Sequence, residues 1–204
     1  MAENKPEMQL DNLEDLKTLV KTAVSKMGPQ YSKEEKIAQA KILLKVFEQG
    51  IAPREAMNIP EEEIARMYSF AYSLFNTGQY ANARELFKML IMFDPFNQGF
   101  ASALGVCHHR LKDYKNAARC YMLAASLDES DPLPLFYAYD CFDNLKERGS
   151  AAIMLCNVIT RAGDNPKFAK LKERTELLLK ALDKQLLETD KSFEVQRQAA
   201  QESM

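Results

Sequence analysis

The residues best suited to chemistry are the adjacent histidines His108 and His109, which lie within a helical pattern. His108 stands where a larger core-packing side chain is usual, so we interpret it as part of the core. Carboxylate pairs such as Asp140 and Asp143 are typical of an exposed helix surface. The sequence has no Gly-rich phosphate loop and no G-x-S-x-G or H-E-x-x-H motif. These residues predict no enzyme, no metal site and no cofactor, and they favour a binding role for His109.

Four cysteines are present, and no two of them form a C-x-x-C pair. Each lies within a helical pattern: Cys107, Cys120, Cys141 and Cys156. This distribution predicts reduced, packed cysteines in a cytoplasmic protein.

The composition is that of a globular protein. Hydrophobic residues make up 47% and charged residues 27% of the 204 residues, which predicts one domain, alone or with an appendage. The sequence has only seven Gly and eight Pro, with many Ala, Leu, Lys and Glu, which favours helix over sheet. A net charge of −2 gives no reason to expect a nucleic-acid partner. Because there is no 18-residue apolar run and no basic, apolar start typical of a secretory signal, we expect no stable membrane association.

A repeat of 34 residues first appears from Ile64 to Asn97. Small residues stand at Ala71 and Ala83, Gly78 marks a turn, and Pro95 closes the unit. This is the spacing of the tetratricopeptide repeat, a helix–turn–helix unit whose small residues let the two helices approach closely. Larger side chains at helical spacing would pack around the pair: Met67, Phe70, Leu74, Tyr80, Phe87 and Leu90. A single unit cannot bury its own apolar faces, so neighbouring units are expected.

Two further copies follow without a gap, at 98–131 and 132–165. The second copy keeps Leu104-Gly105 as its apolar–small pair. The third departs at a few positions: Tyr139, Arg148 and Val158. We therefore predict an all-α tetratricopeptide-repeat solenoid with three tandem repeats (64–97, 98–131 and 132–165) within residues 60–165.

Two amphipathic helices are expected before the repeats. Residues 1–9 have the composition of a flexible polar tail, and 10–59 that of a helical extension. A first helix would end at Gly28-Pro29, and a capping box, Ser32 with Glu35, would start a second that stops at Gly50. Residues 51–63 would form a loop, where Pro60 and three glutamates begin the first repeat. This hairpin either caps the open end of the stack or offers an apolar face to a second copy, forming a homodimer.

The region 166–204 is predicted to be a capping helix that covers the final repeat. It would begin at Asn165-Pro166 and fray beyond Leu187. Its apolar stripe steps by three and four residues: Phe168, Leu171, Thr175, Leu178 and Leu182.

The first helices of stacked tetratricopeptide units line a concave face, which we expect to be a peptide-binding groove. The candidate groove residues are Ala65, Tyr68, Tyr72, Phe75, Asn76, Ser102, Val106, His109, Phe136 and Asp140. Arg110 points to the same face. Tyr68, Tyr72 and Phe75 lie one turn apart and would form a ladder of aromatic side chains, good anchors for an extended chain. The alternative is that they pack under the preceding helices.

Some tetratricopeptide modules grip the C-terminal carboxylate of heat-shock chaperones with Lys and Asn on this face. This chain has Tyr68 and Tyr72 at the two positions of the first repeat, and Leu133 and Tyr137 where the third would supply its basic pair. The clamp is absent, and the expected groove suits a partly hydrophobic, extended segment.

The block from IPEEE through the repeats resembles the class II chaperones of bacterial type III secretion, the SycD/LcrH/IpgC group. The similarity lies in IPEEE, MYSFAYSLFNTGQYANARELF, D-P-F-N, LGVCHHRLKDYKNAARCY and the stretch PLFYAYDC from Pro134, and covers roughly residues 59–165. The resemblance implies a cytoplasmic bacterial protein of three repeats that holds an extended segment of a hydrophobic, pore-forming translocator. It also implies groove roles for Tyr68, Tyr72 and Phe75, and dimerisation through N-terminal helices. This chain differs in having a longer N-terminal region and a longer last helix.

We therefore predict a secretion chaperone that keeps translocators soluble by masking an apolar segment. The alternative is a repeat scaffold or adaptor for a regulatory or assembly complex, with no protective role.

Overall fold

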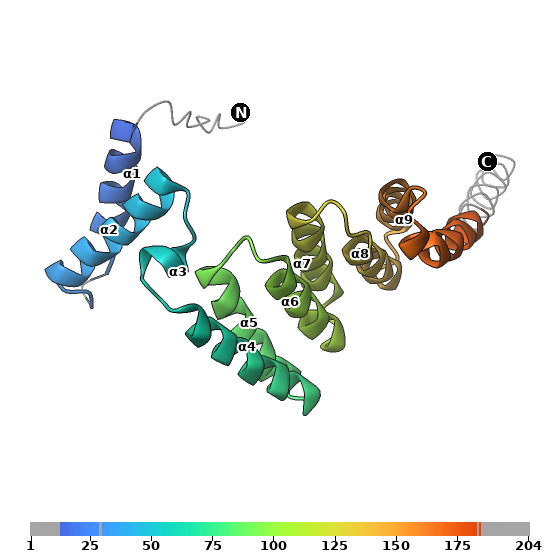
Figure 1. The fold of residues 1–204 in the computed structure, drawn as a ribbon, viewed down its shortest axis with the longest axis horizontal. Coiled ribbons are helices and arrows are strands. Elements are labelled where there is room, and N and C mark those ends of the chain that lie inside the picture. The colour runs from blue at the N-terminus through green and yellow to red at the C-terminus, as the bar shows by residue number, and fades with distance from the viewer. Residues whose placement is uncertain (1–12, 29, 183, 185–204) are drawn as a thin grey trace, which may run out of the picture. The chain divides into compact units, whose positions relative to one another are not determined.

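The computed structural model describes residues 13–28, 30–182 and 184, and within these residues it contains helices and no strand. The helices in chain order are α1 (Leu13–Ser25), α2 (Lys33–Gln49), α3 (Pro53–Ala56), α4 (Glu61–Asn76), α5 (Tyr80–Phe93), α6 (Gln98–Arg110), α7 (Tyr114–Leu127), α8 (Leu133–Asn144), α9 (Arg148–Ala162), the 3-10 turn η1 (Pro166–Phe168) and a last helix over 169–182 (Figure 1). The all-α prediction is confirmed. No helix in this described part is long and apolar enough to cross a membrane.

The chain divides into two compact units. Of the described residues, those between 13 and 67 and 92–95 belong to the first unit, and those of 68–91 and between 96 and 184 to the second. The division falls inside α4, whereas the sequence places the start of the repeats at residue 60, and that boundary remains a prediction.

The first unit contains the α1–α2 hairpin and α3. The Ser32 hydroxyl accepts the Glu35 amide at 3.1 Å, while the Glu35 carboxylate accepts the Ser32 amide at 2.7 Å, so the predicted capping box is confirmed. Gly50 ends α2 with a left-handed φ of 63°. The predicted loop 51–63 contains a short helix, α3, because Pro53 has the fixed φ that suits a first helical position.

Much of the apolar side of α2 is exposed within this unit, including Ile37, Leu43 and Phe47, whereas Val20 on α1 is buried. These exposures agree with either role predicted for the hairpin, and the choice between a cap and a dimer surface stays open.

The second unit follows the 34-residue period at its turns. Gly78, Lys112 and Lys146 occupy equivalent positions and all have a left-handed backbone, with φ of 79°, 60° and 62°. Each turn links two antiparallel helices, and α6, α7, α8 and α9 lie side by side in chain order (Figure 1). The turn conformation is therefore conserved between repeats even where the sequence has no glycine.

Small residues allow the helices of the repeats to approach closely and to form the core. A Cβ atom added to Gly105 on α6 would lie 2.8 Å from the Tyr121 ring on α7, so no larger residue fits there without movement. Ala71, Ala83 and Ala138 are likewise fully buried. The small positions predicted from spacing are the contact points of the helix pairs.

Phe70 departs from the expected pattern because its side chain is 59% exposed. The equivalent positions in the next repeats, Leu104 and Ala138, are buried. Ala138 belongs to a core cluster with Ala117 and Tyr121 of the preceding repeat, whereas the first repeat has no repeat before it.

The third repeat is joined to the second by Arg161, whose guanidinium donates to the carbonyl of Ala125 at 2.6 Å. This contact satisfies an acceptor near the end of α7 that the helix itself leaves unpaired. The departures predicted for this repeat do not disrupt packing, since Val158 is fully buried and Tyr139 is half-buried.

The last helix covers the final repeat as predicted, after a 3-10 turn rather than directly from Pro166. Leu182 packs with Ala151 and Leu155 of α9, and Phe168 and Thr175 are buried. The Thr175 hydroxyl donates to the Leu171 carbonyl at 2.7 Å, which lets a polar residue occupy the buried stripe. The predicted tails, 1–9 and beyond Leu187, lie outside the described residues.

The four cysteines are free, and their environments differ. Cys107 and Cys141 are fully buried, and burial raises the pKa of their thiols to about 11 and about 12. Cys120 is half-buried, with a pKa raised by burial to about 11. Cys156 is exposed, so the prediction of a packed residue is wrong there. The buried face of α9 runs through Leu155, and the next residue lies about 100° around the helix.

Replacing Lys112 by glycine is expected to raise the free energy of unfolding by about 0.5–1 kcal/mol, because a left-handed φ strains any residue that carries a Cβ. Urea titration measures the change. Arg119→Gly, at an exposed position within α7, is the control and should lower the free energy of unfolding by about 1 kcal/mol. A loss of stability in Lys112→Gly would contradict the strain at this turn.

At neutral pH we expect Cys156 to react quickly with a chromogenic disulfide reagent, while Cys107 and Cys141 stay unreacted until the protein unfolds. The buried thiols remain protonated because their pKa values lie far above the pH of the assay. Mass mapping identifies the labelled residue, and Cys156→Ser should abolish the fast phase. If fast labelling persists in this variant, then Cys107 or Cys141 is accessible to the reagent and the burial described above is wrong.

Candidate functional site

Two neighbouring hollows lie in the second unit, and they are lined mainly by the first helices of the repeats. The first, which we call the aromatic hollow, has a volume of about 150 Å³. Its walls are Tyr68, Tyr72, Phe75, Phe87, Ala103 and Val106. The second, the polar hollow, has a volume of about 560 Å³. Its walls are Val106, His109, Arg110, Tyr121, Phe136, Tyr137, Tyr139, Asp140, Arg174 and Leu178.

A stack of three rings on α4 forms one wall of the aromatic hollow. The ring centroids of Tyr68 and Tyr72 are 6.3 Å apart with an interplanar angle of 18°, and those of Tyr72 and Phe75 are 6.4 Å apart at 25°. The residues are spaced by three and four along α4, which places them on one face. The sequence-predicted ladder is therefore present in the structure.

The rings of the ladder differ in how firmly they are held. Tyr68 packs edge-on against Phe87 of α5, with centroids 5.9 Å apart, and against Phe100 of α6 at 5.7 Å. Tyr72 is 51% exposed and meets only its ladder neighbours among the ring contacts of the described residues. Tyr68 thus contacts the buried ring of Phe87 and also lines the hollow, while about half of Tyr72 is exposed to solvent.

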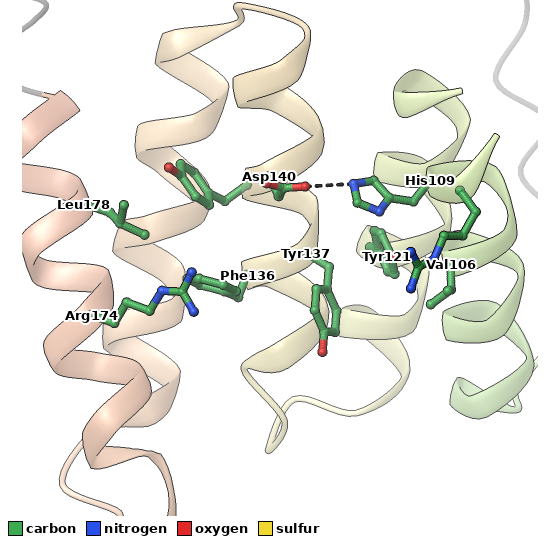
Figure 2. A pocket seen from close by; sticks show the side chains of 10 residues that line it. Val106, His109, Tyr121, Phe136, Tyr137, Asp140, Arg174 and Leu178 are labelled. Atoms are coloured by element: carbon green, nitrogen blue, oxygen red, sulfur yellow. Dashed lines mark hydrogen bonds and ion pairs between the residues drawn. The ribbon is translucent and has the colours of Figure 1, made fainter. Parts of the chain in front are cut away.

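The polar hollow combines aromatic walls with charged groups, as Figure 2 shows. His109 on α6 and Asp140 on α8 approach across it, with Nε2 and Oδ2 separated by 2.7 Å. The Arg174 guanidinium, from the last helix, lies over the Phe136 ring, 5.2 Å from its centroid. The histidine, aspartate and arginine side chains of this hollow therefore come from three elements: α6, α8 and the last helix.

Tyr121 and Tyr139 of this hollow remain neutral hydroxyls at ordinary pH. Burial raises the pKa of Tyr121 far above its usual value. Burial, followed by the nearby carboxylates of Asp143 and Asp140, raises the pKa of Tyr139. Both phenols therefore offer an O–H donor and an oxygen acceptor rather than a charge.

His108 lies on the opposite side of its helix from this surface and is buried. Its Nδ1 lies 2.9 Å from the Asp113 carboxylate, which also caps α7 by accepting the Asn116 amide. Hydrogen bonds, first that from the Asn116 side chain, hold the pKa of Asp113 below its usual value. The core role predicted for His108 matches this position, and the described residues contain no cluster of ligands suited to a metal ion.

The structure brings most of the predicted groove residues together. Tyr68, Tyr72 and Phe75 line the aromatic hollow; His109, Phe136 and Asp140 line the polar hollow; Val106 lines both. Three predicted residues line neither: Ala65 and Asn76 are exposed on α4, and Ser102 is half-buried on α6. Their assignment to a binding site remains a prediction.

Several lining residues were not among the candidates: Phe87, Ala103, Arg110, Tyr121, Tyr137, Tyr139, Arg174 and Leu178. Arg110 lies at a position that the repeat register already pointed to this face. Phe87 and Tyr121 come from second helices, and Arg174 and Leu178 from the last helix. A rule that counts only first-helix positions cannot find them.

Comparison with known proteins agrees with this architecture. Models of the tetratricopeptide repeat match residues 64–95 and 102–131. The low calcium response locus protein H of Yersinia pseudotuberculosis is 27% identical over 124 residues, which cover 61% of this chain and 74% of that protein. The chaperone protein SicA of Salmonella typhimurium is 26% identical over 172 residues, covering 83% of this chain and 94% of SicA.

Solved structures give the same result. The chaperone SycD of Yersinia enterocolitica, in complex with a peptide of the translocator YopD, superposes with a TM-score of 0.58 at 25% identity, covering 62% of this chain and 97% of SycD. PcrH in complex with the chaperone binding region of PopD shares the fold, with a TM-score of 0.58 and 23% identity over 62% of this chain and 96% of PcrH. This chain is therefore a tetratricopeptide-repeat protein homologous to the class II chaperones of type III secretion.

Proposed function

We propose that this protein is a secretion chaperone of the bacterial cytoplasm that holds an extended, apolar segment of a pore-forming translocator. The observation that carries the proposal is the aromatic hollow, where Tyr68, Tyr72 and Phe75 present a stacked wall at the mouth of a cavity. The chaperone SicA and the translocator peptide bound to SycD support the same role.

The mechanism is masking rather than chemistry. Apolar side chains of the segment would enter the aromatic hollow and displace water from rings that otherwise face solvent. Burying a few hundred Å² of apolar surface at ~25 cal/mol per Å² contributes several kcal/mol before ordering costs. Such a grip is strong enough to keep the segment from aggregating and weak enough to be reversed, and it requires no nucleotide and no catalytic residue.

The polar hollow complements this grip by fixing the direction and register of the segment. An extended chain exposes backbone N–H and C=O groups, which need partners once water is excluded. The tyrosine hydroxyls and the His109–Asp140 pair offer donors and acceptors beside the apolar hollow. The partner is therefore a mixed segment, apolar at its anchors and polar between them.

Co-expression tests the proposal directly. The protein is produced together with the translocators encoded beside its gene, and we expect them to become soluble and to co-purify with it. The control is the same translocators produced alone, which should aggregate. If the translocators are equally soluble in both cultures and none is retained, the chaperone function is wrong and a scaffold role in an assembly complex is favoured.

Replacing Tyr72 by alanine should weaken binding of the retained translocator about tenfold and leave the fold intact, because Tyr72 is half exposed and its ring contacts among the described residues are with Tyr68 and Phe75 alone. Isothermal titration measures the affinity, and thermal unfolding checks stability. Phe96→Ala is the matched control, since Phe96 is 68% exposed and lines neither hollow. Tyr68→Ala should lower both affinity and stability, since Tyr68 packs on Phe87. If Tyr72→Ala binds the translocator as tightly as the wild type does, the aromatic ladder is not part of the binding site.

A further inference from the structure

We propose that the polar hollow is a subsite for an acidic side chain of the bound segment, with Arg110 and Arg174 as the groups that recognise its carboxylate. This inference rests on the proposed function, because it assigns a chemistry to one position of the segment that the groove would hold. It requires an acidic residue in a bound segment whose other contacts are mainly apolar.

The charge balance of the hollow carries the argument. Its lining has two guanidinium groups and one carboxylate, that of Asp140. Asp140 is already bonded to His109 at 2.7 Å. Arg110 and Arg174 are exposed and form no ion pair with any described residue, and the Arg174 guanidinium lies over the Phe136 ring. Two cations without a carboxylate partner therefore face a cavity large enough for a side chain.

The remaining walls suit the other parts of an acidic side chain. Val106, Phe136 and Leu178 give apolar surface against which its methylene groups can pack. Arginine matches carboxylate geometry with parallel N–H donors, and the contact with the Phe136 ring favours a position of the Arg174 guanidinium at the wall of the hollow. The neutral Tyr139 hydroxyl adds a further donor without adding charge.

The position of the acidic residue along the segment follows from the shared wall. Val106 lines both hollows, so they are adjacent. Packed helices lie about 8–10 Å apart, and an extended chain advances about 3.3 Å per residue, so one to two helix spacings correspond to about two to six residues. The acidic side chain is therefore expected about two to six residues from the apolar anchor in the aromatic hollow.

The carboxylate of a chain terminus has the same chemistry as an acidic side chain. We commit to the side chain, because an extended segment that crosses the aromatic hollow has a continuing chain on either side. The test separates the two sources with a peptide whose C-terminus is either free or amidated.

The experiment uses the full chain and a synthetic peptide of the segment that limited proteolysis of the co-purified translocator complex leaves protected. If no translocator co-purifies, the proposed function itself fails, and that failure is distinct from the outcomes below. Affinity is measured by titration for the wild type and for Arg110→Gln, Arg174→Gln and the double variant. Arg119→Gln, on α7 and outside both hollows, is the matched control.

We expect each single variant to bind about tenfold more weakly than the wild type, since hydrogen bonds to charged groups are stronger than neutral ones. Arg119→Gln should bind as the wild type does. Replacing the acidic residue of the peptide by glutamine should weaken binding to the wild type and leave binding to the double variant unchanged, as a coupled pair requires. Higher salt should weaken wild-type binding more than binding to the double variant.

Two further measurements test the geometry of recognition and the source of the carboxylate. Arg174→Lys retains the charge and loses the planar fork, so it should bind less tightly than the wild type and more tightly than Arg174→Gln if the carboxylate is recognised. A peptide with an amidated C-terminus should bind as tightly as the free acid. The inference is overturned if the arginine variants bind like the wild type, if the glutamine peptide loses affinity equally on every protein, or if amidation alone abolishes binding.

Discussion

The close approach of two helices within each repeat is the constraint on which the rest of the second unit depends. Gly105 lies against the Tyr121 ring so closely that a single added methyl group would overlap it. A fully buried alanine, Ala71, stands at the equivalent position of the first repeat. Because backbones meet there, large side chains are displaced to the other faces of the helices. Some fill the spaces between repeats, and others line the hollows.

The groove follows from this packing and needs no dedicated loop. Each repeat contributes its first helix, so successive units add successive parts of one wall. The aromatic hollow comes from the first two repeats, and the polar hollow from the last two with the final helix. The repeat architecture thus places different chemistries next to each other, apolar rings at one position and charged groups at the next, without altering the scaffold. Side chains on the faces that leave the core are free to differ, and in this chain they give the two hollows different chemistry.

Sequence reasoning succeeded where the interactions are local or periodic. The Ser32–Glu35 capping box joins residues three apart, and the repeat period fixes the turns, so both could be predicted without a structure. It failed where the outcome depends on tertiary neighbours. Phe70 is exposed because no repeat precedes it, and α3 is too short for a periodic signal. In the candidate site, the ladder was found from its spacing along one helix. The His109–Asp140 bond and the stacking of Arg174 on Phe136 join separate elements, and no local pattern encodes them.

Tyr68 both lines the aromatic hollow and packs against the neighbouring helices. Its ring touches Phe87 and Phe100, so the floor of the cavity and the packing of α4, α5 and α6 share the same atoms. Anything that fills the cavity therefore also braces the junction between the first two repeats. By thermodynamic linkage, occupancy of the cavity and the order of that junction favour each other, so the empty protein is expected to be the looser of the two forms. A protease or a heat pulse would then distinguish occupied from empty molecules without any label on the ligand.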